Sequence, residues 1–231
     1  MALFYLKFRL LENARSDCMT LFAGMSKEDD DRDMGEGIAL IGRWSTLGEG
    51  AGFCVCRAKD AQTLGRWLSN WSTMATIEAI PIVDDNQARA IILGKPPDYT
   101  VDYGRAGETS ADGDSLYFIE YRFHAGCKAE GYKTFADLSR EDDLKDAGNN
   151  VCLGRWHDLG SGSGIAVCSS KSEVDLYTWA YRWMALCDVK ITPVLHDDEF
   201  RAMMRQKPDF SKKHAALMER MLPKRAGFFW R

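Results

Sequence analysis

Residues 40–53 read LIGRWSTLGEGAGF, and residues 152–165 read CLGRWHDLGSGSGI. Both stretches carry Gly-Arg-Trp and then a series of alternate glycines. The similarity extends outward in the same order: LFYLKFR at 3–9 resembles LYFIEYR at 116–122, and the tryptophan pair Trp67/Trp71 recurs as Trp179/Trp183. Because order and spacing are kept along nearly the whole chain, the sequence predicts two diverged copies of one unit.

Each copy has the pattern of a small α+β unit. In the first copy, alternating apolar residues predict strands over 3–10, 38–44 and 53–57,. Helices are predicted up to residue 25 and over 60–74, and a fourth strand ends at Pro81; the acidic stretch 27–36 is predicted to be a loop. This order, βαββαβ, is that of the ferredoxin-like fold, whose sheet is antiparallel with both helices on one face.

The other face of each predicted sheet needs a cover. A bare apolar sheet face is unfavourable in water, and two copies in one chain can cover each other's sheets. We therefore expect an α+β protein in which two tandem ferredoxin-like units form a pseudo-twofold body resembling a dimeric α+β barrel, followed by a C-terminal helix and tail. The predicted boundaries are 1–97 for the first repeat, 98–115 for an acidic linker, 116–210 for the second repeat and 211–231 for a basic, aromatic tail.

Composition excludes some classes of protein. The chain has 231 residues, is 45% hydrophobic and carries a net charge of −4, which is ordinary for a globular protein,. Overall acidity argues against a nucleic-acid-binding protein, which needs a basic face. No apolar run approaches the roughly 20 residues of a membrane span. No nucleic-acid or membrane partner is expected. No signal or transit peptide is visible, so residence in an organelle would require a targeting segment that precedes this sequence.

The cysteines do not form a recognisable metal motif. There are seven, and no two have CxxC spacing. Structural zinc sites need paired ligands at such spacings. We expect the cysteines to be small core residues in a reducing compartment. No metal and no cofactor are predicted.

Arginine and tryptophan are the repeated residues that could bind a ligand. Arg43 and Arg155 could each bind an anion or hold the acidic stretch of their own unit. The tryptophans of each pair lie four residues apart and share a helix face, where they could stack on a flat ligand or pack a helix on its sheet. The sequence leaves these alternatives open.

No catalytic constellation is visible. His157 and His196 lie near repeated motifs, but the first copy has Ser45 and Asp84 at these positions, so a metal site or general base there would not be duplicated,. The serines and cysteines lack the pattern of an activated nucleophile. We expect no catalytic residues and a protein that is not an enzyme.

The C-terminal region has no counterpart in the first copy. From residue 205 onward it holds eight basic and two acidic residues, and a short helix is predicted over 215–222. The chain then ends in Phe228, Phe229, Trp230 and Arg231. Consecutive aromatic residues are costly to leave in water, and aromatic and Arg side chains are common anchors of interfaces. We expect these four residues to mediate self-assembly by docking on another copy, with packing on their own domain as the alternative.

The Gly-Arg-Trp segments, the glycine turn, the Trp-containing helix and the segment ITPVLHDDE at 191–199 resemble an uncharacterised bacterial and algal domain family. That resemblance implies a dimeric α+β-barrel fold and supplies no catalytic residues. The tandem arrangement with a distinct tail also resembles the pyrenoid shell proteins of diatoms and related algae. This second resemblance implies a structural protein of the chloroplast stroma and pyrenoid, with a second copy of the chain, Rubisco or a related shell protein as partners.

Two functions are therefore expected from the sequence. The first is a non-enzymatic structural protein that self-assembles into a sheet or shell lattice. The alternative is a small-molecule-binding protein or monooxygenase-like enzyme of the dimeric α+β-barrel type. Its cavity would lie between sheet and helices, with Arg43, Arg155 or His157 at the mouth.

Overall fold

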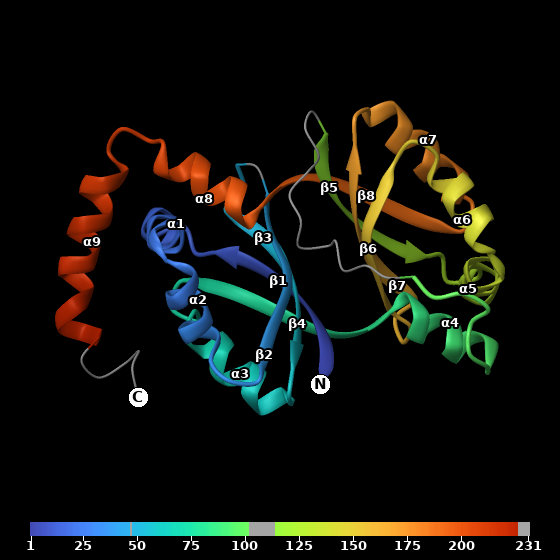
Figure 1. The fold of residues 1–231 in the computed structure, drawn as a ribbon, viewed down its shortest axis with the longest axis horizontal. Helices are drawn as coiled ribbons and strands as arrows, with labels where there is room; N and C mark the ends of the chain where they lie inside the picture. The colour runs from blue at the N-terminus through green and yellow to red at the C-terminus, as the bar shows by residue number, and fades with distance from the viewer. Residues whose placement is uncertain (47, 102–113, 226–231) are drawn as a thin grey trace. The chain divides into compact units, whose positions relative to one another are not determined.

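The computed structural model describes residues 1–46, 48–101 and 114–225, with side chains up to residue 220. The chain divides into two compact units (Figure 1). Unit 1 consists of residues 1–79 and 195–231, and unit 2 consists of residues 80–194. Each unit has antiparallel strands with helices packed on them, which confirms the predicted α+β class with two tandem ferredoxin-like units.

Unit 1 begins with the first repeat and ends with the C-terminal helices. Its elements are β1 (Ala2–Leu10), α1 (Arg15–Gly24), α2 (Lys27–Met34), β2 (Ile38–Thr46), β3 (Ala51–Ala58), α3 (Ala61–Ser69), α8 (Asp197–Arg205) and α9 (Phe210–Arg225). Strand β3 lies between β1 and β2 and is antiparallel to both.

Unit 2 has the matching set. Its elements are α4 (Asp85–Leu93), β5 (Ser115–Phe123), α5 (Lys128–Asp137), α6 (Arg140–Ala147), β6 (Val151–Asp158), β7 (Ser163–Ser170) and α7 (Glu173–Trp183). Strand β7 pairs with β5 and β6, as β3 pairs with β1 and β2.

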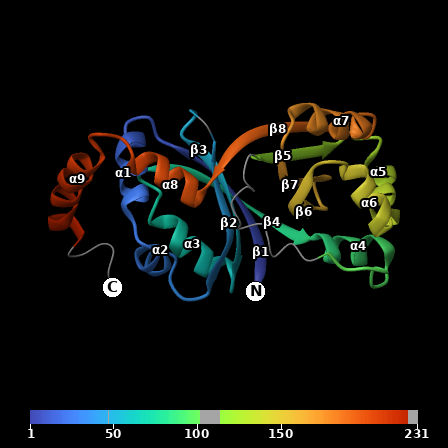
Figure 2. The same cartoon turned by 45° about the horizontal axis from the view of Figure 1, so that its top comes forward.

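Two strands run from one unit into the other. Strand β4 (Ala75–Asp84) begins in unit 1 and ends in unit 2, while β8 (Cys187–His196) begins in unit 2 and ends in unit 1. The helix that follows each strand therefore belongs to the unit built mainly from the other sequence repeat. Thus α8 packs against α1 in unit 1, and α4 packs against α5 in unit 2 (Figures 1 and 2).

The repeated glycines form tight hairpin turns. Gly48 and Gly50, between β2 and β3, have φ of 85° and 62°, a region that L side chains rarely adopt,. Gly162 has φ of 77° at the same place in the second hairpin. Each hairpin also contains a β-bulge, where the register shifts between Leu40 and Gly42 in β2 and between Cys152 and Gly154 in β6. The predicted turns are confirmed.

The acidic stretch predicted to be a loop is instead the helix α2, and α6 is its counterpart. The Ser26 side chain accepts a hydrogen bond from the Asp29 backbone, and Asp29 accepts one from the Ser26 backbone, which is a capping box,. Acidic side chains in a first turn are also favourable beside the positive helix N-terminus. This capping pattern outweighs the low hydrophobicity that suggested a loop.

The paired tryptophans pack a helix onto its sheet in each unit. Trp67 is 5% exposed and belongs to a core cluster with Leu6, Cys54, Cys56 and Leu64. The indole N–H groups of Trp67 and Trp71 both donate to Asp33, at 2.9 and 2.8 Å. In unit 2, Trp179 and Trp183 donate to Asp146 in the same way, at 3.0 and 2.8 Å. One carboxylate thus fixes the orientation of both rings.

The described part of the C-terminal region folds against its own unit. Helix α9 is longer than predicted at both ends and packs on α1 and α8. His214 stacks on Phe210, Leu217 is buried, and Arg220 forms an ion pair with Asp17 of α1. The four residues expected to mediate self-assembly, 228–231, lie outside the described residues.

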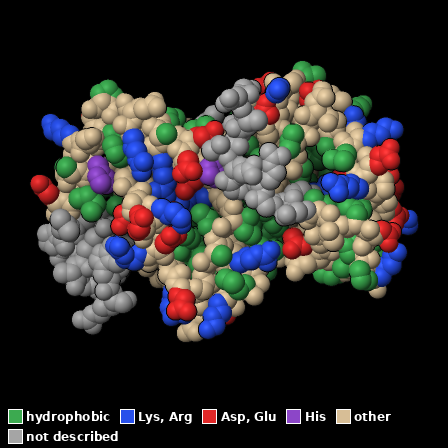
Figure 3. Space-filling model, viewed as in Figure 1, with side chains coloured by type: hydrophobic (Ala, Val, Ile, Leu, Met, Phe, Trp, Pro, Cys, Tyr) green, Lys and Arg blue, Asp and Glu red, His purple; other side chains and the backbone are tan. Residues whose placement is uncertain are grey.

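The visible surface carries charges of both signs. Lys and Arg side chains are interspersed with Asp and Glu over the face in Figure 3. No helix of the described structure combines the length and the hydropathy that crossing a bilayer requires,.

Candidate small-molecule site

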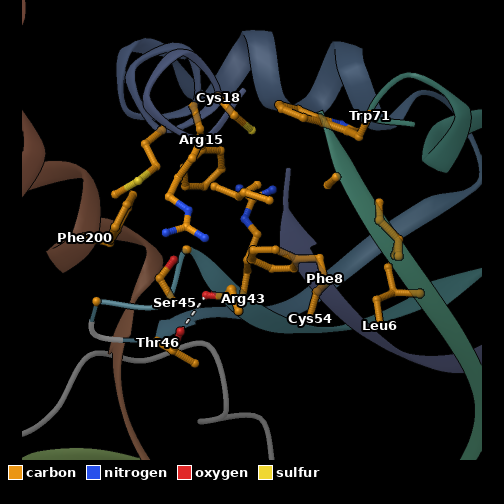
Figure 4. Close-up of a pocket in the computed structure, with 18 of the residues that line it drawn as sticks. Leu6, Phe8, Arg15, Cys18, Arg43, Ser45, Thr46, Cys54, Trp71 and Phe200 are labelled. Carbon is orange, nitrogen blue, oxygen red and sulfur yellow. Dashed lines mark hydrogen bonds between the residues drawn. The ribbon is translucent and has the colours of Figure 1, made fainter. Parts of the chain in front are cut away.

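An apolar cavity of about 420 Å³ lies within unit 1, between the sheet and the helices. Strands β1 to β4 supply its floor, and helices α1, α3 and α8 supply its walls (Figure 4). Its lining includes aromatic side chains from all sides, among them Phe8, Phe22, Trp71 and Phe200. Most ligand pockets have this character, a concave apolar lining with a few polar groups. The cavity lies where the sequence predicted one, and Arg43 lines it.

Arg43 is held by two carboxylates of its own unit. Its guanidinium contacts Asp197 of α8 at 3.1 and 2.7 Å and Asp30 of α2 at 3.2 and 2.5 Å. Arg201 completes the group, with Nη2 2.9 Å from Asp30 Oδ2 and 3.3 Å from Asp197 Oδ2. All four side chains are nearly buried. The charges balance within the cluster, so Arg43 acts by joining β2 to α2 and α8.

Unit 2 contains the same cluster. Arg155 contacts Asp85 of α4 at 2.7 and 2.9 Å and Asp143 of α6 at 3.0 and 2.7 Å. Arg89 takes the place of Arg201, 3.5 Å from Asp85 and 3.6 Å from Asp143. Of the two alternatives for the repeated arginine, the structure supports the one in which it holds the acidic segment of its own unit.

The cavities of the two units differ greatly in size. In unit 2 the space at the corresponding position is about 50 Å³. Three equivalent positions explain the difference. Phe123 ends β5 where Leu10 ends β1, Tyr132 is the fifth residue of α5 where Met19 is the fifth of α1, and His157 follows Gly-Arg-Trp where Ser45 does. In each pair the residue in unit 2 has the larger side chain, which carries a ring and lines the small cavity there. The second repeat has filled the space that the first keeps open.

His157 is built into a buried hydrogen-bonded chain rather than exposed at a mouth. Its Nδ1 lies 2.5 Å from the Tyr121 hydroxyl, and its Nε2 lies 2.9 Å from Asp85 Oδ1. Burial lowers the pKa of His157, and the opposing attraction of Asp85 does not restore it. Burial alone would raise the pKa of Asp85, but Arg155 and His157 hold it well below its usual range. The neutral imidazole therefore donates from Nε2 to an ionised Asp85 and accepts from the Tyr121 hydroxyl at Nδ1.

The other predicted histidine also has a structural role. His196 is the N-cap of α8, and its Nδ1 accepts from the Asp198 backbone N–H at 3.4 Å. Asp84 caps α4 at the equivalent position. The structure does not bring His157 and His196 together in one described site, and the described residues contain no cluster of three or more His, Cys, Asp or Glu side chains able to hold a metal.

The pocket residues that sequence reasoning missed come from helices. Arg15, Cys18, Met19 and Phe22 line the cavity from α1, and Phe200 and Met203 line it from α8. A signal was present in the sequence, because the two repeats differ in side-chain size at equivalent positions. The first repeat has Met19 where the second has Tyr132, and Ser45 where the second has His157. Such pairs become informative only once the structure shows that they line one space.

Solved structures with a similar fold include enzymes. A mutant chlorite dismutase from Candidatus Nitrospira defluvii in complex with cyanide is 10% identical, with a TM-score of 0.51, and the match covers 87% of this chain and 94% of that one. A DypB variant from Rhodococcus jostii RHA1 in complex with haem has 9% identity and a TM-score of 0.48, covering 87% and 96%. A candidate monooxygenase from Lactobacillus acidophilus NCFM has 8% identity and a TM-score of 0.47, covering 85% and 95%. The match to chlorite dismutase shows a shared fold, and no substrate is transferred from it.

The lining of the unit 1 cavity does not suit haem. Haem iron is usually held by an imidazole, a thiolate, a phenolate or a methionine sulfur paired with histidine. The described lining residues include neither histidine nor tyrosine. Burial raises the pKa of Cys18 to about 12, and a hydrogen bond with Cys56 together with burial raises that of Cys54, so both remain thiols at neutral pH. In unit 2, both ring nitrogens of His157 are already engaged.

The similar structures contradict the main functional expectation from the sequence. The fold shared with chlorite dismutase, an enzyme, overturns the expectations of a non-enzymatic structural protein and of a shell lattice. The physical reason for the error is that the pocket is built from dispersed apolar residues, which leave no motif in the sequence. The findings favour the small-molecule alternative, and the resemblance to pyrenoid shell proteins has no support from them.

Family membership rests on the repeat itself. No curated protein matches the chain. A family model matches it twice, once over each sequence repeat and across most of its length. The chain therefore belongs to the family described as "Domain of unknown function (DUF3303)", through residues 2–95 and 115–208.

Proposed function

We propose that this protein is a small-molecule-binding enzyme of the monooxygenase-like kind, with its site in unit 1. The observation that carries the proposal is the cavity of about 420 Å³ and its filled counterpart of about 50 Å³ in the same chain. Closing such a space gains packing energy, since interiors are normally filled to crystal-like density. One repeat has closed it, and an open apolar cavity in the other is suited to an apolar ligand.

The lining favours a substrate that supplies much of its own reactivity. The described residues around the cavity include no Asp, Glu or His that could act as a general base,. Among them the thiols of Cys18 and Cys54 are held protonated. This suits a polycyclic compound with an acidic methylene group, which can lose a proton and react with dioxygen. One oxygen atom becomes the product carbonyl, and the other leaves as water with the two methylene hydrogens. The protein would bind the compound and exclude water.

Binding can be tested by filling the cavity with the side chains of the second repeat. The ligand is phenylnaphthylamine, a neutral apolar fluorophore. We expect one molecule to bind per chain, and the double variant Met19→Tyr/Ser45→His to weaken binding at least about tenfold, because the lost apolar contact area is worth more than 1.4 kcal/mol. Fluorescence titration measures the affinity, and thermal unfolding confirms that the variant is folded.

An exposed apolar surface provides the matched control. Tyr181 on α7 is 73% exposed, and the first repeat has Ser69 at this position. The Tyr181→Ser variant should bind the fluorophore as the unmodified protein does. Weaker binding in this variant with unchanged binding in the filled variant would place the fluorophore on the surface and reject the proposed site. Oxygen uptake with polycyclic compounds that carry an acidic methylene tests the enzymatic part.

The location and partners expected from the sequence remain proposals. They are the chloroplast stroma, a second copy of this chain, and Rubisco.

A further inference from the structure

Arg15 is a cation of the cavity whose charge no described carboxylate balances. It is the first residue of α1, and its side chain lines the pocket. Its Nε is buried and has no hydrogen-bond partner among the described residues. Figure 4 shows the guanidinium reaching from α1 toward Ser45 on β2.

The other arginines near this cavity have carboxylate partners, although Nε of Arg201 is likewise buried without a hydrogen-bond partner among the described residues. Arg43 and Arg201 share the carboxylates of Asp30 and Asp197, and these four charges balance. No described carboxylate reaches Arg15. A buried N–H of a charged group without an acceptor is unfavourable, and an oxygen anion arriving in the cavity would relieve it. Lys207 adds a second positive charge at the exposed rim of the cavity.

We propose that the ligand of unit 1 carries an acidic oxygen group, such as a carboxylate, enolate or phenolate, and that Arg15 selects it. This inference rests on the proposed function and names the class of compound: an apolar body that fills the cavity with an anionic oxygen at the α1 end. Arg15 then acts as the specificity-determining residue. For a substrate with an acidic methylene, the same contact stabilises the anion formed when the proton is lost.

The second repeat separates the structural from the binding role of this cation. Lys128 begins α5 as Arg15 begins α1, and each side chain packs over the hairpin glycine of its own unit. A Cβ on Gly50 would lie 2.5 Å from Arg15 Nε, and one on Gly162 would lie 2.6 Å from Lys128 Cε. Packing over the turn therefore needs only a long cationic chain. The Nε–H that arginine adds is present only in the unit with the open cavity.

The test compares two fluorophores that have the same rings and differ in charge. Anilinonaphthalene sulfonate carries an oxygen anion, and phenylnaphthylamine is neutral. In Arg15→Met we expect the affinity for the sulfonate to fall at least about tenfold, while the affinity for the neutral compound stays within about twofold. Arg15→Lys, which installs the residue of the second repeat, should fall between. Lys128→Met is the control in unit 2 and should change neither affinity.

Each of the other outcomes overturns one defined part of the proposal. Equal losses for both fluorophores would show that Arg15 only supports the fold of the pocket. Unchanged binding of the sulfonate would show that Arg15 does not select anions, while the proposed function would stand. Failure of both fluorophores to bind the unmodified protein would reject the proposed function itself. If Arg15→Met proves unfolded by circular dichroism, Arg15→Gln takes its place with the same expectations.

Discussion

Arg43 and Arg155 show how one residue type can be kept for the same reason in both repeats. Each donates in a bidentate manner to two carboxylates, one from the acidic helix of its own repeat and one from the helix that begins at Asp197 or Asp85. The planar guanidinium fits two carboxylates at once, which a lysine cannot do. The sequence could indicate that this arginine mattered, but only the structure supplies the second carboxylate.

His157 makes the stability of unit 2 depend on pH. Its pKa is lowered from the ordinary value of 6.5, so the unfolded chain takes up this proton at a higher pH than the folded protein. The folded state is therefore disfavoured progressively as pH falls below 6.5. The lowered pKa of Asp85 acts in a separate window, where stability is lost as pH falls below 3.8,.

The variant His157→Gln should remove the first of these two losses. We expect it to be less stable than the unmodified protein at pH 7.5, because the contacts of Tyr121 and Asp85 are weakened. Between pH 7.5 and 5 its stability should fall less steeply. Urea unfolding midpoints across this range measure the effect, and the remaining histidines are common to both proteins. Parallel curves would mean that His157 does not titrate as described.

Among the elements, the strands and the helices α1, α3, α5, α7 and α9 were predictable, whereas the helices α2, α4, α6 and α8 and the pocket were not. The β2–β3 hairpin followed from alternating residues and alternate glycines, and α3 from the stripe that contains Leu64 and Trp67. The helix is shorter than the predicted 60–74, because it ends at Ser69. Helix α2 was missed because its eight residues are mostly charged. Its stability comes from the Ser26 capping box and the contacts of Asp30 and Asp33, which are made across the unit. The bulges in β2 and β6 also left no sequence pattern that predicted them.

The filled cavity of unit 2 should reopen when its rings are reduced. In the double variant Phe123→Leu/Tyr132→Met, both positions take the residues of the first repeat. We expect about 2–4 kcal/mol of destabilisation, because buried aromatic atoms are removed and the site collapses only partly. The binding stoichiometry of phenylnaphthylamine should rise from one to two per chain. Chemical unfolding measures the first effect and calorimetric titration the second.

The control is a similar reduction in side-chain size at a position away from the cavity. Tyr177→Met alters an exposed tyrosine on α7 and should affect neither stability nor stoichiometry appreciably,. A stoichiometry that stays at one in the double variant would show that other side chains close the space in unit 2.

At the scale of the whole molecule, the sequence repeats and the structural units are not the same segments. The first repeat matches the family over residues 2–95, yet unit 1 takes residues 1–79 and recruits 195 onward. Comparison of the repeats could not reveal this, because both arrangements give the same pattern of strands and helices. Buried ion pairs decide which helix completes each unit. Examples are Arg43 with Asp197 in unit 1 and Arg155 with Asp85 in unit 2.

Separated repeats should therefore not fold alone. A fragment of residues 1–96 lacks α8, which leaves Arg43 without Asp197 and exposes the side of α1 that α8 covers. A fragment of residues 114–231 lacks α4 and Asp85. Removing one partner of a buried ion pair commonly costs about 3–5 kcal/mol, a large part of the stability of a small domain.

We expect each fragment to show no cooperative thermal transition by circular dichroism and an equimolar mixture to recover one. The intact chain is the control, since it keeps every described element. A cooperative transition in the fragment 1–96 alone would show that α8 is dispensable for unit 1.

The exchange of α4 and α8 between repeats bears on how one chain came to have one open and one closed cavity. Two separate, identical polypeptides could trade these helices equally well, but they would share every substitution, so both cavities would open or close together. Fusing the two genes ends that constraint. Each half can then acquire its own side chains while still depending on the other for its last helix. We therefore expect the closed half to be required as a scaffold for the open one.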